Sequence, residues 1–101
     1  MLEMIARMFQ GIDYKELIAK GAVIVDVRSP AEYRTGSIRG SKNIPLNTIT
    51  KKALEIKKWE KKVVLCCASG MRSGQATSIL KNHGVEAHNG GGWSSLQYKL
   101  K

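Results

Sequence analysis

The sequence predicts an α/β fold in which a parallel sheet is covered by helices on both faces. Short apolar runs typical of buried strands alternate along the chain with segments whose apolar residues recur at helical spacing. Glycines and capping residues separate these segments, and no internal repeat or linker interrupts them. In folds of this class, ligands bind at the carboxyl ends of the strands. That edge of the sheet is therefore where a functional site is expected.

The first half of the chain is expected to form one strand and three helices. Asp13 and Glu16 have the spacing of a capping box for a short helix that Gly21 ends. Residues 22–27 are apolar except for one aspartate, as in a strand covered on both faces. A serine and a proline at 29–30 begin the second helix. The third helix follows residue 47, and the residues sharing its apolar face are Ile49, Ala53 and Ile56.

The second half of the chain contains the most informative segments. Residues 63–67 are predicted to form a central strand and residues 73–83 the helix that follows it. A further strand is predicted over 85–88, and the three glycines at 90–92 are predicted to form a tight loop. The last helix begins at Trp93, with its apolar residues at helical spacing.

The length of 101 residues fits a single domain over 1–101, with residues 1–12 as an N-terminal extension or short helix. Acidic and basic residues interrupt the apolar positions of that extension, which is unlike a signal peptide. No apolar run reaches the twenty residues of a membrane span. The sequence thus predicts a cytoplasmic protein without a membrane partner.

Charge favours anionic ligands, because 17 basic residues against 8 acidic ones give a net charge of +9. The lysines at 51–62 are interpreted as the solvated face of a helix. Nucleic-acid binding would need basic residues interleaved with stacking aromatics, and only 6% of the residues are aromatic. No nucleic-acid partner is expected.

Cys67 is the candidate nucleophile. It ends the strand predicted at 63–67, and the small residues of the loop that follows allow backbone N–H groups to turn inward beside a helix N-terminus. Such donors stabilise a thiolate and lower the thiol pKa from about 8.5. A lone cysteine at a strand end would ordinarily be interpreted as a packing residue, but a packing residue needs neither this loop nor the arginine at its end.

The neighbouring Cys66 is expected to point to the opposite face of the sheet and to be inert. Adjacent cysteines close only a strained ring, so a structural disulfide is not expected. The two histidines, His83 and His88, have no metal-ligand spacing with the cysteines. The glycines at 90–92 lack the lysine of a phosphate-binding loop. Neither a metal nor a cofactor is predicted.

The segment CASGMRS at 67–73 resembles the active-site loop of rhodanese-like domains. Three further segments resemble that family in the same order: DVRSPAEY at 26–33, GSIRGSKNIP at 36–45 and NGGGW at 89–93. The similarity covers nearly the whole chain from about Tyr14 onward. One departure is Ser37, where the family often has histidine after the glycine of its second segment.

The resemblance implies a five-stranded parallel sheet and an enzyme, a thiosulfate sulfurtransferase that carries sulfane sulfur as a Cys67 persulfide. The donor would be a small anion such as thiosulfate, and the acceptor cyanide, a thiol or another protein. The implied substrate-binding loop comprises Ala68, Ser69, Gly70, Met71, Arg72 and Ser73, and the supporting residues are Asp26, Arg28, Glu32 and Trp93.

Several roles stay open from the sequence. Arg72 either attracts the sulfonate end of thiosulfate or pairs with Glu32 or Asp26 to fix the loop, and Arg28 is another partner for Asp26. Trp93 either lines the pocket or belongs to the core. Two rival functions remain: a phosphatase or arsenate reductase, whose loop must surround a tetrahedral oxyanion, and a binding or redox-sensing module with negligible turnover.

Overall fold

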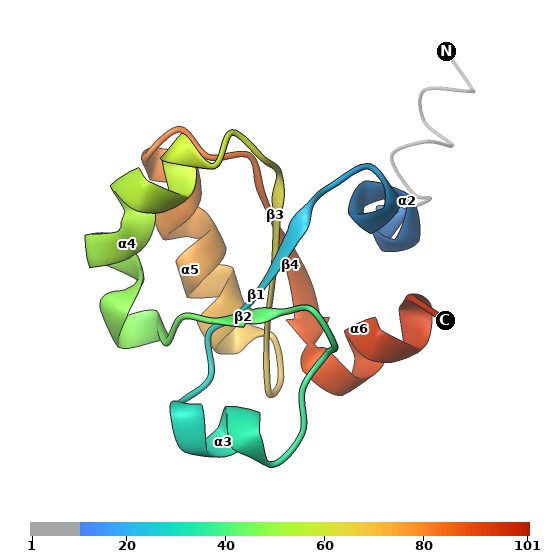
Figure 1. Ribbon diagram of the computed structural model, residues 1–101. Coiled ribbons are helices and arrows are strands. Elements are labelled where there is room, and N and C mark those ends of the chain that lie inside the picture. Colours follow the sequence, from blue (N-terminus) through green and yellow to red (C-terminus); the bar gives the residue numbers. More distant parts are fainter. Residues whose placement is uncertain (1–10) are drawn as a thin grey trace.

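The computed structural model describes residues 11–101, in which helices alternate with strands (Figure 1). The elements in chain order are α2 (Tyr14–Ala19), β1 (Val23–Asp26), α3 (Pro30–Arg34), β2 (Lys42–Asn43), α4 (Leu46–Lys58), β3 (Val63–Cys67), α5 (Met71–Asn82), β4 (Ala87–Gly92) and α6 (Trp93–Lys99). The extension predicted over 1–12 lies, up to residue 10, outside the described residues. No helix in the described part is both long and apolar enough to cross a membrane.

The sheet has four parallel strands in the order β2-β1-β3-β4. The parallel α/β architecture is therefore confirmed, whereas the fifth strand implied by the resemblance is not found among residues 11–101. The described segment before α2 is not extended into a strand, and Gly11 there has a left-handed backbone with φ of +74°. The edge strand β2 is only two residues long.

The last strand differs from its prediction. A strand was expected over 85–88 with a glycine loop after it, but β4 spans Ala87–Gly92 and includes all three glycines. Close approach to β3 explains this, because a Cβ on Gly90 would lie 3.0 Å from the Leu65 carbonyl oxygen, and one on Gly92 would lie 2.8 Å from that of Ala68. Glycine thus allows β4 to pair beside the end of β3.

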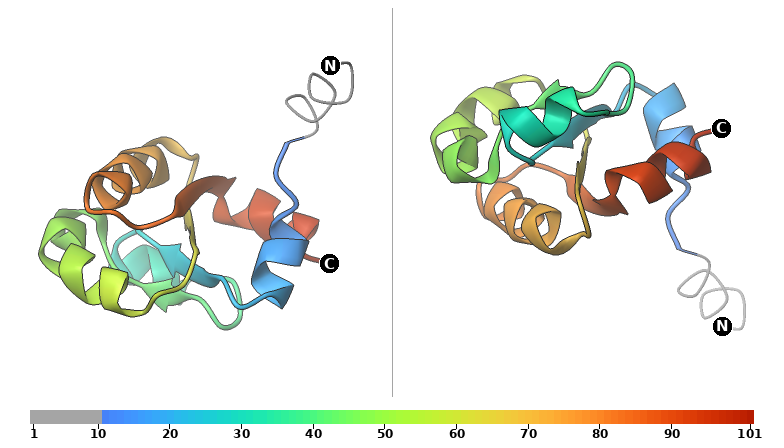
Figure 2. Two further views of the ribbon diagram at one scale, coloured as in Figure 1. Left: turned by 90° about the horizontal axis from the view of Figure 1, so that it is seen from above. Right: turned by 90° about the horizontal axis from the view of Figure 1, so that it is seen from below.

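Helices cover both faces of the sheet, α4 and α5 on one and α2 and α6 on the other (Figure 2). Two apolar cores result. The α4–α5 core contains Cys67, and the α2–α6 core contains Cys66. The predicted alternation of the two cysteines is confirmed, as is the apolar face of α4, on which Ile49, Ala53 and Ile56 are buried.

The capping boxes are distributed differently from the prediction. The Asp13 side chain accepts a hydrogen bond from the Glu16 backbone, as expected, but the Glu16 carboxylate pairs with Lys20 at 2.7 Å instead of returning to the cap. The complete reciprocal box is at Ser29 and Glu32, where α3 begins. This box fixes the start of α3 at the carboxyl edge of the sheet, next to the loop that follows β3.

Candidate active site

The carboxyl end of β3 positions Cys67 at the base of a tight turn. Residues 68–70 reverse the chain and α5 begins at Met71, two residues earlier than predicted. Gly70 makes this early start possible, because it caps the helix with φ of +103°, a conformation that side chains other than glycine rarely adopt. We call residues 68–73 the cradle loop.

Backbone and side-chain donors of the cradle loop converge on the Cys67 sulfur. The Gly70 N–H donates to Sγ at 2.9 Å and the Ser73 N–H at 3.4 Å, while the Ser73 hydroxyl oxygen lies 3.3 Å from Sγ. Burial raises the pKa of the Cys67 thiol, but these donors and the Ser69 N–H together outweigh burial and lower the pKa below its usual value. The loop therefore stabilises a sulfur anion.

The neighbouring thiol has the opposite character. Cys66 faces the other core, and burial, together with the charge of Asp26, raises its pKa to about 12. A thiol with this pKa stays protonated near neutral pH and is a poor nucleophile. The difference between the two cysteines follows from the alternation of side chains along one strand.

Arg72 does not point into the cradle. Its two terminal nitrogens donate to the two Glu32 carboxylate oxygens at 2.7 and 2.9 Å, which links the start of α5 to α3. The Arg72 guanidinium and the capping bonds from Ser29 lower the pKa of Glu32 to about 2. Of the partners that the sequence left open, the structure selects Glu32.

Asp26 and Arg28 form a second, buried pair, in which Arg28 donates to both carboxylate oxygens at distances of 2.8 to 3.0 Å. Arg28 also donates to the Gly36 carbonyl oxygen and lies over the Trp93 ring, 4.7 Å from its centroid. Trp93 packs on the core of Cys66, not beside the Cys67 sulfur. The contacts of Trp93 are therefore those of a core residue.

Asn89 is a site residue that the sequence did not indicate. It lies on β4, and its carboxamide bonds both the Gly70 carbonyl oxygen (3.1 Å) and the Ser73 hydroxyl group (2.7 Å). Asn89 opens the segment NGGGW that resembles the family, but that segment assigned it no role, because its partners at the site are 16 and 19 residues away in the chain. Only the pairing of β3 with β4 brings it to the cradle loop.

The sulfur itself has no exposed surface, since the relative exposure of Cys67 is 0%. The outer side of the cradle loop is open, with Ala68, Ser69 and Met71 exposed. Beside Arg72 a shallow groove runs along the same edge of the sheet, and its lining residues are Val27, Ser29, Pro30, Pro45, Leu46, Asn47, Thr48 and Arg72. The exposed side of the cradle loop and this groove therefore lie on the same edge of the sheet.

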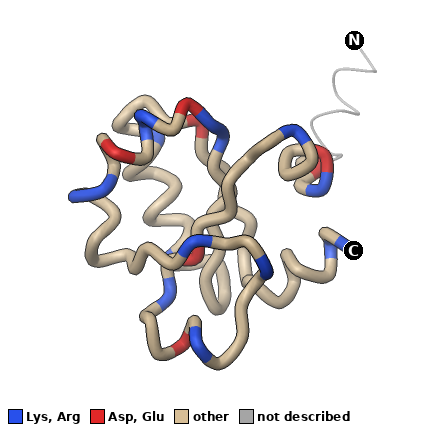
Figure 3. Tube along the Cα trace, viewed as in Figure 1, with Lys and Arg blue, Asp and Glu red and all other residues tan. Residues whose placement is uncertain are grey.

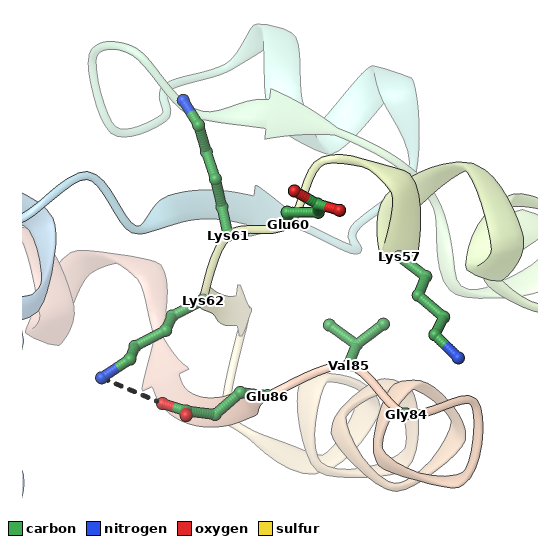
Figure 4. A pocket seen from close by; sticks show the side chains of 7 residues that line it. All are labelled: Lys57, Glu60, Lys61, Lys62, Gly84, Val85 and Glu86. Carbon is green, nitrogen blue, oxygen red and sulfur yellow. Dashed lines mark ion pairs between the residues drawn. The ribbon is translucent and has the colours of Figure 1, made fainter.

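A second hollow lies at the opposite, amino edge of the sheet (Figure 4). Its basic side chains do not converge: Lys57 and Lys61 point away from one another, and Lys62 pairs with Glu86 at 3.4 Å. A ligand in this hollow would meet no focused set of polar groups. The cradle loop is thus the better candidate for the active site.

Comparison with known proteins identifies related domains. A family model of the Rhodanese-like domain matches residues 12–98. An uncharacterized protein of Bacillus subtilis, YqhL, is 38% identical over 82 residues, covering 79% of this chain and 64% of that protein. The thiosulfate:glutathione sulfurtransferase of Saccharomyces cerevisiae is 32% identical over 87 residues, covering 71% of this chain and 63% of the yeast protein. The chain thus spans less than two thirds of either relative.

The fold is also similar to that of solved structures. A crystal structure described as rhodanese with anions from E. coli superposes with a TM-score of 0.67 and 31% identity, covering 74% of this chain and 91% of that one. The family match includes β3, the cradle loop and the start of α5, which together hold Cys67. The chain belongs to the family of rhodanese-like domains, a family in which its relatives include sulfurtransferases.

Proposed function

We propose that this protein is a sulfurtransferase that moves sulfane sulfur from thiosulfate, or a similar small anionic donor, to a thiol or other thiophilic acceptor. The observation that carries the proposal is the convergence of the Gly70 and Ser73 donors on the Cys67 sulfur. Names of relatives such as the yeast thiosulfate:glutathione sulfurtransferase support the same class of reaction.

Two displacements at sulfur account for the transfer. The Cys67 thiolate attacks the outer sulfur of thiosulfate, an S–S bond to Cys67 forms, and sulfite leaves with the electron pair of the broken bond. An acceptor thiolate then attacks the outer sulfur of the Cys67 persulfide, and the Cys67 thiolate is the leaving group. Both steps pass through sulfur anions, which the inward N–H groups of the cradle loop stabilise.

The geometry disfavours a phosphatase or arsenate reductase. An oxyanion of that kind is bound by a free guanidinium with two donors aimed at it. Here the Arg72 guanidinium is committed to Glu32 in a bidentate pair, and the turn from Cys67 to Arg72 is tight enough to bring N–H groups within 3.4 Å of Sγ. Both observations favour a cradle for a sulfur anion over a site for a tetrahedral oxyanion.

One observation favours a second candidate, a binding or redox-sensing module with negligible turnover. Cys67 has an exposure of 0%, so its sulfur is less accessible than that of a cysteine on an open surface. Steady-state turnover with thiosulfate and cyanide distinguishes the candidates. The sulfurtransferase gives continuous thiocyanate release, whereas the module gives at most one equivalent.

Substitution of each cysteine tests the assignment of the nucleophile. Cys67→Ser is expected to abolish turnover, and Cys66→Ser to keep most of it, because the Cys66 thiol faces the opposite core and has a pKa raised to about 12. The two variants are matched in chemistry and in strand position, so each controls for the other. A folded Cys66→Ser protein without activity would refute the assignment.

A further inference from the structure

Asn89, Ser73 and Cys67 form a chain of polar contacts from the surface to the buried sulfur. The Ser73 hydroxyl oxygen lies 2.7 Å from the Asn89 carboxamide oxygen and 3.3 Å from the Cys67 sulfur. Ser73 and Cys67 are fully buried, with exposures of 0%, whereas Asn89 is exposed. The buried hydroxyl therefore has two neighbours that compete for its hydrogen bonds.

The orientation of the Asn89 carboxamide is fixed by the groups around it. The Gly70 carbonyl oxygen only accepts, so the nitrogen Nδ2 faces it at 3.1 Å. The Gly91 N–H only donates, so the oxygen Oδ1 faces it at 3.0 Å. Oδ1 is therefore also the atom that faces Ser73, and it only accepts. The Ser73 hydroxyl must supply the proton of that hydrogen bond.

A hydroxyl group has one proton, which it gives to Asn89 or to the sulfur. While Cys67 is protonated, its S–H donates to the Ser73 oxygen, and the Ser73 O–H donates to Asn89. When the sulfur becomes an anion it has no proton to offer, and it instead gains a charge-assisted bond if the hydroxyl turns toward it. Asn89 then keeps the bond from Gly91.

Gly74 of α5 leaves room for the Asn89 carboxamide beside Ser73. Gly74 is helical with an ordinary backbone conformation, so no turn requires glycine there. A Cβ at Gly74 would lie 3.2 Å from the Asn89 nitrogen Nδ2. Glycine is a poor helix former compared with alanine. Its presence in the second turn of α5 leaves the space that the Asn89 carboxamide occupies.

We propose that Asn89 is a positioning residue for the sulfur chemistry, which competes with Cys67 for the Ser73 hydroxyl proton and so limits how strongly that hydroxyl stabilises the sulfur anion. The proposal rests on the proposed function in one respect, that the Cys67 anion is the reactive form. It assigns Asn89, an acceptor on β4, a role opposite to that of the donors of the cradle loop. Those donors favour the anion, and Asn89 favours the thiol.

The charged groups near the site do not account for the stabilisation of the thiol that we assign to Asn89. Arg72, whose charge acts on Cys67, pairs with Glu32, and Arg28 pairs with Asp26. Neither ion pair bonds to Asn89 or to the Ser73 side chain. Substitution of Asn89 leaves both pairs in place, and the Gly70 carbonyl keeps its helical bond from the Gly74 N–H at 3.0 Å.

The test is a double-mutant cycle on Asn89→Ala and Ser73→Ala, in which the pKa of Cys67 is read from the pH midpoint of alkylation by iodoacetamide. The midpoint is compared, not the absolute rate, because the sulfur is buried. Asn89→Ala should lower the pKa of Cys67 by about 0.5–1 unit, because it frees the Ser73 hydroxyl to donate to the sulfur anion. A hydrogen bond to an anion is stronger than one between neutral groups by a free energy equivalent to about that shift. In the Ser73→Ala background the same substitution should have no effect.

Two further variants extend the test beyond the cycle. Asn89→Asp, a stronger acceptor, should raise the pKa of Cys67 more in the parent than in the Ser73→Ala background. Asn82→Ala removes an exposed carboxamide at the far end of α5 and should leave the pKa unchanged. Thermal unfolding confirms that each variant is folded.

A purely structural role predicts the opposite sign, because loosening the cradle loop withdraws donors and raises the pKa. A rise in pKa for Asn89→Ala, no change, or an equal fall in both backgrounds would overturn the proposal. Alkylation does not require sulfur transfer. If the protein proved unable to transfer sulfur, the cycle would still report on Asn89, and the two ideas fail separately.

Discussion

Gly70 combines two properties at one position of the cradle loop. Its backbone has φ of +103°, and in that conformation its N–H points at the Cys67 sulfur at 2.9 Å. A Cβ at Gly70 would lie 3.4 Å from the Gly91 Cα, so β4 already packs closely against this side of the loop. Both the conformation and the space therefore favour glycine.

Gly70→Val is expected to slow the reaction with thiosulfate by at least about tenfold, because valine disfavours a φ of +103° and its N–H would no longer point at the sulfur. Loss of one hydrogen bond to a developing anion costs roughly 2 kcal/mol or more. The measurement is the second-order rate of persulfide formation. Gly21→Val is the matched control. Gly21 has the same φ of +103°, a Cβ there would meet no atom within 4 Å, and the residue precedes β1 at the opposite edge.

Gly21→Val should lower stability without changing the rate per folded molecule. Equal rates for parent and Gly70→Val, with both proteins folded, would mean that the Gly70 N–H does not contribute to the chemistry.

At the scale of elements, one ion pair connects α3 to α5. The Arg72–Glu32 pair is bidentate, its side chains are 37% and 39% exposed, and Glu32 also belongs to the capping box of α3. The Glu32 carboxylate thus contacts both the start of α3 and the start of α5, the helix that begins beside Cys67. Its main effect is to fix the shape of the carboxyl edge.

The pKa of Glu32, lowered from 4.5 to about 2, predicts a pH dependence of stability. A carboxyl group with a lowered folded-state pKa stabilises the fold above the unfolded-state value, and this contribution is lost as pH falls through the folded-state value. The difference in urea midpoint between the parent and Glu32→Gln should therefore be full at neutral pH and should shrink between about pH 4.5 and pH 2.

Glu55→Gln provides the control, because Glu55 is paired to Lys52 at 3.5 Å on the exposed face of α4. Surface pairs of this kind contribute little. If the urea midpoints of the parent and Glu32→Gln differed by the same amount from neutral to acidic pH, the ionised carboxylate of Glu32 would not be the source of its stabilising effect.

The elements that the sequence predicted well are those with local signals. The periodic apolar residues of α4 and the Ser-Pro start of α3 depend on neighbours within a turn or two, and both were found as expected. The strand through the glycines at 90–92 was missed because its cause is the close approach of β3, a contact between distant segments. Asn89 was missed for the same reason.

At the scale of the whole molecule, the charged residues of the described part, 11–101, are unevenly placed relative to the active edge. Figure 3 shows basic residues on many of the described elements, and lysines lie in the last turns of α4 and α5. At the active edge, by contrast, Arg28 and Arg72 are each paired with an acid. β3 separates the two edges, and its five residues span about 17 Å. The lysines therefore act on a ligand at Cys67 only through the long-range field.

Salt is expected to reveal this field. Between about 0.01 M and 0.15 M salt the Debye length falls from roughly 30 Å to 8 Å. It is therefore longer than the span of β3 at low salt and shorter than that span at high salt. The second-order rate with thiosulfate should fall several-fold over this range, while alkylation of Cys67 by neutral iodoacetamide should change little. Lys57→Glu should lower the thiosulfate rate at low salt only. A salt-independent rate would exclude steering by the net charge of +9.

The role of Cys67 as the sulfur carrier is tested most directly by the intact mass of the protein after incubation with thiosulfate and removal of excess donor. We expect a gain of one sulfur atom, localised to the peptide containing Cys67, lost on addition of cyanide or a thiol, and absent from Cys67→Ser. Cys66→Ser should gain the same sulfur atom as the parent. An unchanged mass in the folded parent, or a sulfur atom that Cys67→Ser also gains, would contradict the assignment of Cys67 as the sulfur carrier.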